Sequence, residues 1–389
     1  MSYNVSAPTH SLYIHWPFCP YKCHFCPFVA LASHDQFMTR YHEALTTEIK
    51  AYAQSCTEKF SIETIYMGGG TPSTYPPDLL LDMFGILKNM FPLASSAEVT
   101  MEVNPGTVQE EHFMIWKNAG INRLSIGVQG LKDSVLKSLN RHQSAQDVAW
   151  LLSRAHKVFE NLSIDLILGL PGVSDEEWRD VVKQVVTWPI THVSLYFLTV
   201  HENTPLYFKV QKNAVQLPPD DSLVDLYHWS VNEFERHGLK RYELSSFARD
   251  GFESRHNTVY WERKPFKGFG LGACSFDGTQ RIQNEKNLMR YIDSVKKEDD
   301  ITIFTEELTE DQIYLERLML GLRRRKGVSC ALLMGTSNER TNVAIKNCIE
   351  SLKSYGLLDE SNGTLTLTPK GLMLENEVVT QLSCAGLGG

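Results

Sequence analysis

Three cysteines stand close together near the N-terminus, with three residues between the first two and two between the last two. Cys19, Cys23 and Cys26 follow directly on a predicted strand, in a loop short enough for the three sulfurs to converge. Thiolates bind zinc and iron–sulfur clusters, and both kinds of site commonly take four ligands. Here position 28 is Phe28, and the next cysteine, Cys56, falls in a predicted helix. A metal centre on three thiolates would keep one position open for another molecule.

Simpler interpretations of the cysteine loop stay open at this point. His15 or His24 could complete a zinc site of three cysteines and one histidine, or the three thiols could carry no metal. A glycine run, Gly68-Gly69-Gly70-Thr71-Pro72, follows the second predicted strand. Glycines there let backbone N–H groups approach a ligand closely, although such a run is as often a tight turn.

The composition is that of a folded protein with a sizeable core. Its 389 residues are 42% hydrophobic and 22% charged, and 38 Lys and Arg against 46 Asp and Glu give a net charge of −8. An acidic chain argues against nonspecific polyanion binding as the main activity. Eight cysteines are too sparse for a disulfide framework, and neither a long apolar run nor a secretory signal is visible. We therefore expect a cytoplasmic protein without a transmembrane segment.

Alternating β-rich and amphipathic segments must position these motifs. Helical patterns long enough for crossovers separate the strands, and Thr107, Ser144 and Ser174 each stand three residues before an acid, which predicts helix starts. Repeated βα units form either an open doubly wound sheet or a partial or complete parallel barrel, with functional groups at the strand C-terminal ends in both cases. The predicted strands are Leu12–Trp16, Ile62–Met67, Glu98–Val103, Arg123–Ile126, Leu162–Leu168 and His192–Phe197.

The βα rhythm stops after about residue 300. Thr309 predicts the start of a helix, and a turn at Asn362-Gly363 followed by an alternating strand predicts a hairpin, so the tail is winged-helix-like. The predicted division is a (β/α) core over 1–250, a connecting segment over 251–300 and a C-terminal helical domain over 301–389. The run Arg323-Arg324-Arg325-Lys326 could indicate a nucleic-acid-binding regulator with a metal-sensing cysteine loop, although cations at a helix C-terminus are more simply explained by the helix dipole.

Several motifs together carry a family resemblance. Their order along the chain resembles that in radical S-adenosylmethionine (SAM) enzymes. More narrowly, it resembles the oxygen-independent coproporphyrinogen III oxidase-like family with its HemW-type haem chaperones. The resemblance covers nearly the whole chain and implies a (β/α) barrel of radical SAM type. The motifs are the cysteine triplet, the glycine run to Pro72, Glu102-Val103-Asn104-Pro105, Leu124-Ser125-Ile126-Gly127-Val128-Gln129, Asn140-Arg141, and Ile164-Asp165-Leu166-Ile167 with Gly169-Leu170-Pro171.

The resemblance implies a [4Fe–4S] cluster on Cys19, Cys23 and Cys26, with SAM on the open iron. Such a pair cleaves SAM to methionine and a 5′-deoxyadenosyl radical, while the protein supplies orientation and electrostatics. Each implied SAM contact could also be purely structural, as a helix cap, a surface ion pair or a turn. The implied contacts are Tyr13 and Phe25 beside the cofactor, Gly69, Gly70 and Thr71 at its amino group, Glu102 at its ammonium, Arg141 at its carboxylate, and Gln129 and Asp165 at its ribose.

A second motif, His256-Asn257-Thr258-Val259-Tyr260-Trp261, is similar to the H-N-x-x-Y-W motif that is associated with haem binding in HemW-type proteins. Histidine is a natural axial ligand of haem iron, so we expect His256 to bind haem with Tyr260 and Trp261 against the macrocycle. A hydrogen-bonded structural histidine is the alternative. Where related sequences usually carry a histidine, this chain has Cys274, a possible soft ligand in its place.

Two functions within the family remain. The favoured one is a haem chaperone that takes haem and passes it to haem-accepting proteins. Its electron donor is unknown. The alternative is an oxygen-independent oxidase that decarboxylates coproporphyrinogen III. Phe28 in place of a fourth cysteine and only eighteen residues before Cys19 both favour the chaperone, because the oxidases resemble C-x3-C-x2-C-x-C with a longer N-terminal extension.

Overall fold

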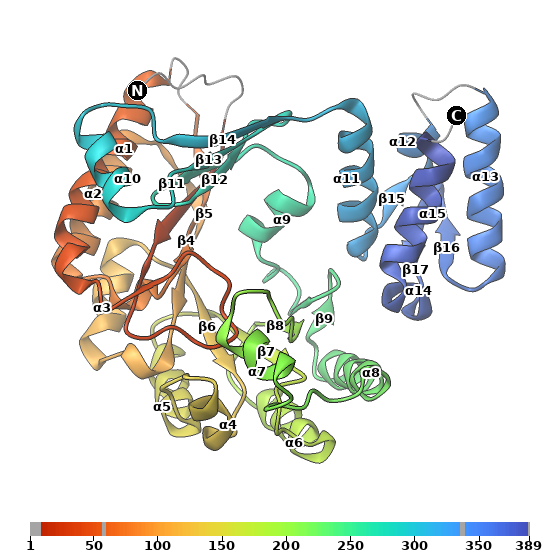
Figure 1. Ribbon diagram of the computed structural model, residues 1–389, viewed down its shortest axis with the longest axis horizontal. Helices are drawn as coiled ribbons and strands as arrows, with labels where there is room; N and C mark the ends of the chain where they lie inside the picture. The colour runs from red at the N-terminus through yellow and green to blue at the C-terminus, as the bar shows by residue number, and fades with distance from the viewer. Residues whose placement is uncertain (1–8, 57–59, 335–338, 388–389) are drawn as a thin grey trace.

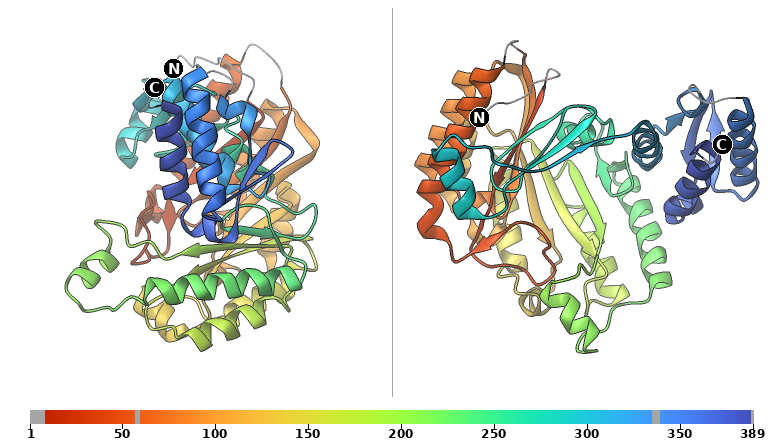
Figure 2. Two further views of the ribbon diagram at one scale, coloured as in Figure 1. Left: turned by 90° about the vertical axis from the view of Figure 1, so that its right-hand side faces the viewer. Right: turned by 45° about the horizontal axis from the view of Figure 1, so that its top comes forward.

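The computed structural model describes residues 9–56, 60–334 and 339–387. A curved sheet forms the centre of the molecule, helices cover its outer side, and a small helical unit lies at one end (Figures 1 and 2). Within the described ranges, no helix combines the length and the apolar character needed to cross a membrane.

The central sheet has nine strands in the order β11-β1-β4-β5-β6-β7-β8-β10-β9. The six strands expected from the sequence lie side by side and parallel, which confirms them. Because the sheet ends at β11 and β9, it is a partial barrel rather than a closed one. Its strands are β1 (Ser11–Trp16), β4 (Ile62–Gly69), β5 (Leu93–Val103), β6 (Arg123–Gln129), β7 (Asn161–Leu168), β8 (His192–Phe197), β9 (Lys240–Arg241), β10 (Ser246–Ala248) and β11 (Lys267–Phe269).

Two of the three helix starts predicted in the barrel are confirmed. Ser144 and Ser174 form the predicted capping boxes of α5 and α6. The prediction at Thr107 was wrong, because Pro105 begins a 3-10 turn and the Thr107 hydroxyl bonds the Asn104 carbonyl at 2.8 Å. The helices are α1 (Met38–Ser55), α2 (Pro77–Met90), α3 (Glu110–Ala119), α4 (Asp133–Ser138), α5 (Ala145–Ala155), α6 (Asp175–Val185), α7 (Pro205–Gln211), α8 (Asp220–Arg236), α9 (Arg255–Trp261) and α10 (Leu288–Lys296), with 3-10 turns at Asp35–Phe37, Pro72–Thr74 and Pro105–Thr107.

Shorter strands lie outside the barrel. β2 (Phe18–Cys19) pairs with β3 (Leu31–Ala32), and these two strands bracket the cysteine loop. β12 (Cys274–Phe276), β13 (Gln280–Asn284) and β14 (Thr302–Glu307) form an antiparallel sheet that leads to the C-terminal unit.

The C-terminal unit has a hydrophobic core of its own. Thr309 caps its first helix with Gln312, and Asn362 and Gly363, with φ of 51° and 72°, form the predicted hairpin turn. Positive φ at both turn positions favours Asn-Gly. Its elements are α11 (Glu310–Arg323), β15 (Val328–Ser329), α12 (Cys330–Met334), α13 (Glu339–Ser354), β16 (Leu358–Ser361), β17 (Thr364–Leu367), α14 (Pro369–Met373) and α15 (Glu375–Leu387).

Polar contacts join the C-terminal unit to the barrel. Arg324 bonds Glu262 at 2.6 Å, and the backbone N–H of Arg325 donates to the Tyr242 carbonyl. Arg263 pairs with Glu316 at 2.7 Å. The domain boundaries proposed from the sequence stay predictions; β11 and α10, from the segment expected to connect the domains, pack on β1 and α1.

A buried carboxylate ties α1 to the last strand of the barrel. Glu48 is 0% exposed and accepts hydrogen bonds from the Gly270 N–H at 2.9 Å, Asn284 at 2.9 Å and Tyr291 at 2.7 Å. Lys267 lies 3.8 Å away on β11. Burial raises the pKa of Glu48 and lowers that of Lys267, so the ionised form of each depends on the other.

We predict that Glu48→Leu lowers the free energy of unfolding by about 3–5 kcal/mol, because it removes one partner of a buried charge pair. Urea denaturation followed by tryptophan fluorescence measures this, since all seven tryptophans lie between residues 16 and 261. Glu43→Leu on the exposed side of α1 is the control and should change stability by less than about 0.5 kcal/mol. Equal effects of the two substitutions would contradict the prediction.

Candidate functional site

A cavity of about 460 Å³ opens at the C-terminal ends of the parallel strands. We call it the cysteine pocket, because Cys19, Cys23 and Cys26 all line it. Residues from β4, β5, β6, β7 and β8 form much of the rest of its wall. This is the end of a parallel sheet at which functional side chains gather.

The cysteine loop is held against the barrel by short polar contacts. The Thr71 hydroxyl donates to the Cys19 sulfur at 3.2 Å, and Arg141 Nη1 lies 3.8 Å from the Cys23 sulfur. The Cys26 N–H bonds the Cys23 carbonyl, which closes a turn between them. Cys19 is only 7% exposed, and burial raises its pKa to about 11. A thiolate there therefore needs a positive charge nearby, and bound metal supplies one.

The geometry does not form a zinc site. In the described ranges, no three His, Cys, Asp or Glu side chains converge on a position for one metal ion. Both ring nitrogens of His15 are hydrogen-bonded, to the Tyr13 hydroxyl and the Val29 carbonyl, and Nδ1 of His24 lies against the Ser138 carbonyl and Lys209. Ligands of a multi-iron cluster bind different metal atoms and stand further apart than ligands of one ion. The three sulfurs around one cavity fit a cluster better.

The glycine run makes the close approach of β4 to the cysteine loop possible. Gly69 has φ of +114°, and a Cβ there would lie 2.5 Å from the His15 ring. A Cβ on Gly70 would lie 2.6 Å from the Pro17 carbonyl oxygen. Only glycine fits at both places. The run therefore serves loop packing, and it also leaves the backbone of Gly69, Gly70 and Thr71 on the pocket wall.

Glu102 presents a carboxyl group to the pocket from the end of β5. Tyr66 donates to one oxygen at 2.9 Å, and the Gly69 N–H donates to the other at 3.2 Å. Burial, together with the nearby Asp165, raises its pKa to about 7. A carboxyl with this pKa exchanges its proton near neutral pH, and a bound cation would favour its ionised form.

Arg141 and Gln129 lie side by side over Gly127. Arg141 Nη2 donates to the Gly127 carbonyl at 2.6 Å, and a Cβ on Gly127 would lie 2.9 Å from side-chain nitrogens of both residues. Gln129 has φ of +64°, a conformation that costs energy in a non-glycine residue and often occurs at functional sites. The register places Gly127 beside Asp165 on β7. Ser125 donates to Asp165 at 3.3 Å, and burial raises the pKa of that carboxyl.

The structure brings eight of the nine predicted SAM contacts to the cysteine pocket. Tyr13 is the exception: its ring stacks on Tyr66 at 6.3 Å, its hydroxyl bonds His15, and it does not line the cavity. Tyr13 and Tyr66 are partners in the strand register, so the two rings lie side by side on one face of the sheet. The eight residues on the pocket wall are Phe25, Gly69, Gly70, Thr71, Glu102, Gln129, Arg141 and Asp165.

Sequence reasoning missed other polar residues of the pocket. Asn104 donates to the Tyr21 hydroxyl at 2.7 Å, and both line the cavity. Ser194 and His201 line it from β8 and the loop after it. Asn104 stood in a motif, and its place after β5 was a usable signal. Nothing local distinguished Ser194 or His201.

The expected haem-binding segment forms α9 and lies between two cavities. His256 is 0% exposed, and its ring nitrogens bond the Thr64 and Tyr260 hydroxyls, each at 2.8 Å. Burial lowers the pKa of His256 to about 3, so the ring is neutral. Asn257 lines the cysteine pocket, whereas Trp261 lines a second cavity. Cys274 is exposed on β12, accepts from Gln283 at 3.4 Å and lines neither cavity.

Comparisons with known proteins agree with this geometry. The family model of the radical SAM superfamily matches residues 13–185, and that of the HemN C-terminal domain matches residues 308–374. The solved structure of the coproporphyrinogen III oxidase HemN from Escherichia coli superposes with a TM-score of 0.82 at 23% identity, covering 97% of this chain and 90% of that one. This likeness shows a shared fold.

Curated relatives are similar over two thirds of the chain or more. Heme chaperone HemW of Bacillus subtilis is 33% identical over 371 residues, covering 95% of this chain and 97% of the relative. HemW of Escherichia coli is 35% identical over 69% of this chain and 70% of the relative. Mouse radical S-adenosyl methionine domain-containing protein 1, mitochondrial, is 33% identical over 69% of this chain and 61% of the relative. The chain therefore belongs to the radical SAM family whose curated members are named heme chaperone HemW.

Proposed function

We propose that this protein is a haem chaperone of the radical SAM superfamily, which binds haem and passes it to haem-requiring proteins. The observation that carries the proposal is 33% identity to a protein named heme chaperone over 95% of the chain. The three-cysteine loop and the charged pocket around it support the same conclusion. The haem acceptor, the electron donor and the cytoplasmic location stay predictions.

Membership of the superfamily implies a [4Fe–4S] cluster and SAM. Cys19, Cys23 and Cys26 would hold the cluster, since they are the three thiols of one cavity and no fourth cysteine lines it. When bound, the two cofactors supply one-electron cleavage of a carbon–sulfur bond. The residues of the pocket suit these two cofactors. Three soft sulfurs are available for the cluster, and a carboxyl and a guanidinium beside them are available for SAM.

The other pocket residues would bind and orient SAM. Glu102 has an acceptor for its ammonium group, and Arg141 has donors for its carboxylate. Gln129 and Asp165 offer an amide and a carboxyl for ribose hydroxyls, and the Phe25 ring offers an apolar surface. Glu102 and Asp165 together give the pocket an acidic side that suits a cationic nucleotide.

Haem contacts within α9 are part of the same proposal. Trp261 presents its ring to a cavity, so it is the member of the motif best placed to contact a macrocycle. His256 could bind iron only after one ring nitrogen is released from its hydrogen bond, to Thr64 or to Tyr260. While these hydrogen bonds are formed, His256 and Tyr260 act as positioning residues that fix α9 against β4.

Haem titration beside an anaerobic decarboxylation assay tests the proposed function. We expect anaerobically reconstituted protein to take up haem with a shifted Soret band and to release no carbon dioxide from coproporphyrinogen III. The fold shared with HemN makes the oxidase the relevant competitor. Decarboxylation together with absent haem uptake would refute the chaperone.

We predict that Cys23→Ala loses iron and SAM cleavage together, because removing one thiolate removes a cluster ligand. Iron and sulfide analysis with a SAM cleavage assay measures both. Cys56→Ala, at the end of α1 and outside the pocket, is the control and should retain both. Iron retained with full cleavage in Cys23→Ala would remove this cysteine from the ligand set.

We predict that SAM binds more tightly as the pH rises from 5 to 7. The pKa of Glu102 is about 7 without ligand, and only the carboxylate form, which dominates above that pKa, attracts the SAM ammonium. Below the pKa, the carboxylate fraction rises by up to about tenfold for each pH unit, and above the pKa it levels off. The apparent Kd should fall by the same factor. Equilibrium dialysis at several pH values measures it.

Glu102→Gln is the control for this pH dependence. It should bind SAM more weakly and with nearly the same Kd at pH 5 and pH 7. If the Kd of Glu102→Gln fell with rising pH as it does in the wild type, a group other than Glu102 would be responsible for the pH dependence.

A further inference from the structure

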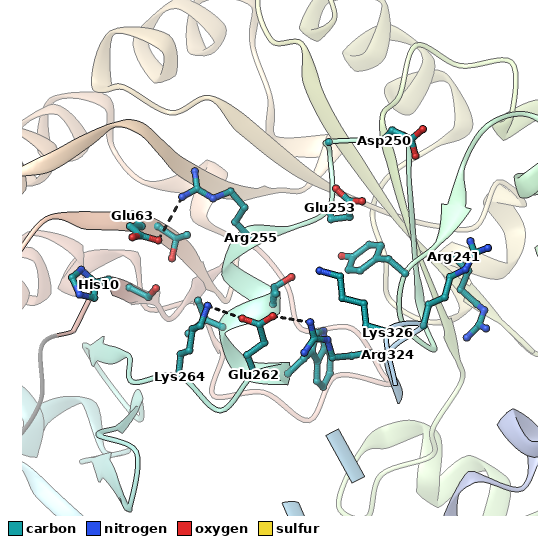
Figure 3. A pocket seen from close by; sticks show the side chains of 18 of the residues that line it. His10, Glu63, Arg241, Asp250, Glu253, Arg255, Glu262, Lys264, Arg324 and Lys326 are labelled. Carbon is teal, nitrogen blue, oxygen red and sulfur yellow. Dashed lines mark hydrogen bonds and ion pairs between the residues drawn. The ribbon is translucent and has the colours of Figure 1, made fainter. Parts of the chain in front are cut away.

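The structure contains a second, larger cavity at the opposite end of the barrel, with a volume of about 960 Å³ (Figure 3). It lies between the N-terminal ends of β1 and β4, strand β9, helix α9 and residues 324–326, which follow α11 in the C-terminal unit. We call it the interdomain pocket. The family's cofactors are not expected there, because the three cysteines line the other cavity.

The lining of the interdomain pocket is basic although the chain is acidic. Seven Lys and Arg and four Asp and Glu line it, a net charge of +3 in a chain of −8. Arg255 pairs with Glu63, and Lys240 pairs with Asp250. Figure 3 shows how Glu262 is shared between Lys264 and Arg324, with both contacts at 2.6 Å.

Three cations and one carboxylate, that of Glu253, remain after these pairs are formed. Among the described residues, no carboxylate lies within ion-pair distance of Arg241, Arg325 or Lys326. Figure 3 shows the Lys326 side chain reaching into the pocket with no dashed contact to the residues drawn. Three unpaired cations facing one cavity repel one another, and an anionic ligand would relieve that repulsion.

The helix dipole does not account for these cations. α11 ends at Arg323, whose guanidinium lies over the Trp261 ring and 3.6 Å from Glu375. Arg324 is the C-cap residue and is paired with Glu262. Arg325 and Lys326 lie beyond the cap, and both are exposed. The dipole explains a cation in the last turn of a helix, and these two residues come after it.

The pocket also offers flat and apolar surface. Trp261, Tyr242, Val259 and Pro265 line it together with the cations. A cavity of this size suits a small-molecule ligand. A ligand with a flat apolar body and carboxylates at its edge would match both parts of the wall, the rings and the three cations.

We propose that the interdomain pocket binds haem, with its two propionates on Arg241, Arg325 and Lys326 and its macrocycle beside Trp261. This inference rests on the proposed function and adds the location and the contacts of the haem. The cysteine pocket has about half the volume and is assigned to a cluster and SAM. Haem would then lie on the far side of α9 from the cluster.

The test compares the binding of ferric haem and of haem dimethyl ester, whose carboxylates are blocked, to the full-length protein. We expect Arg325→Ser with Lys326→Ser to weaken haem binding about tenfold or more and to leave ester binding unchanged, because charge-assisted hydrogen bonds to the propionates are lost. Arg241→Ser is a second variant, on the barrel side of the pocket, and should act in the same direction. Cluster iron content and thermal unfolding confirm that each variant is folded.

Lys297→Ser with Lys346→Ser is the matched control, since it removes two exposed cations that do not line the pocket. It should leave haem binding unchanged. Wild-type protein that binds no haem would refute the proposed function and this inference with it. Haem binding that is the same in wild type and both pocket variants, or ester binding that falls as much as haem binding, would overturn the interdomain site alone.

Discussion

The site depends on how closely the end of β4 approaches the cysteine loop. Gly69 and Gly70 have no room for a side chain against His15 and Pro17, and the hydroxyl of Thr71 reaches the sulfur of Cys19. This contact buries the first thiol and fixes the side of the barrel on which the loop closes. A larger residue at either glycine would push the loop away from the strand ends, and with it the sulfurs from the carboxyls on β5 and β7. The spacing of the cysteines is useful only because this approach is possible.

Charge within the cysteine pocket follows from the strand register. Glu102 and Asp165 stand near each other on β5 and β7, and burial raises the pKa of both carboxyls. Arg141 is the guanidinium on the same wall, and its Nη2 and Nε already bond the Gly127 carbonyl and Gln143. The pocket therefore holds acidic groups that are costly to ionise until a cation enters. SAM carries a sulfonium and an ammonium, so its charge suits these groups, and the sequence order of the motifs alone could not reveal this balance.

The sequence predicted the strands and most of the pocket because both depend on local patterns. β-rich runs gave six parallel strands, and parallel strands bring residues that follow them to one edge. Side-chain contacts between strands were not predictable: Tyr13 lies on a correctly predicted strand, yet its side chain contacts His15 and Tyr66 and does not line the cavity. His256 shows the same limit, since its partner Thr64 is 192 positions away and no local pattern indicates that the ring is already hydrogen-bonded. The sequence indicated two parts of the interdomain pocket, Trp261 and the basic run, but not that they share a cavity, because the walls come from segments far apart in the chain.

Helix α9 gives the two cavities a common wall. Asn257 and Trp261 are four residues apart, about one helical turn, and each lines a different cavity. His256 fixes this helix to β4 through Thr64, and the Ser254 side chain caps its start. The N-terminal face of a parallel barrel ordinarily contributes stability rather than ligand binding. Unpaired cations that share one cavity repel one another, so their presence at this face favours a binding role.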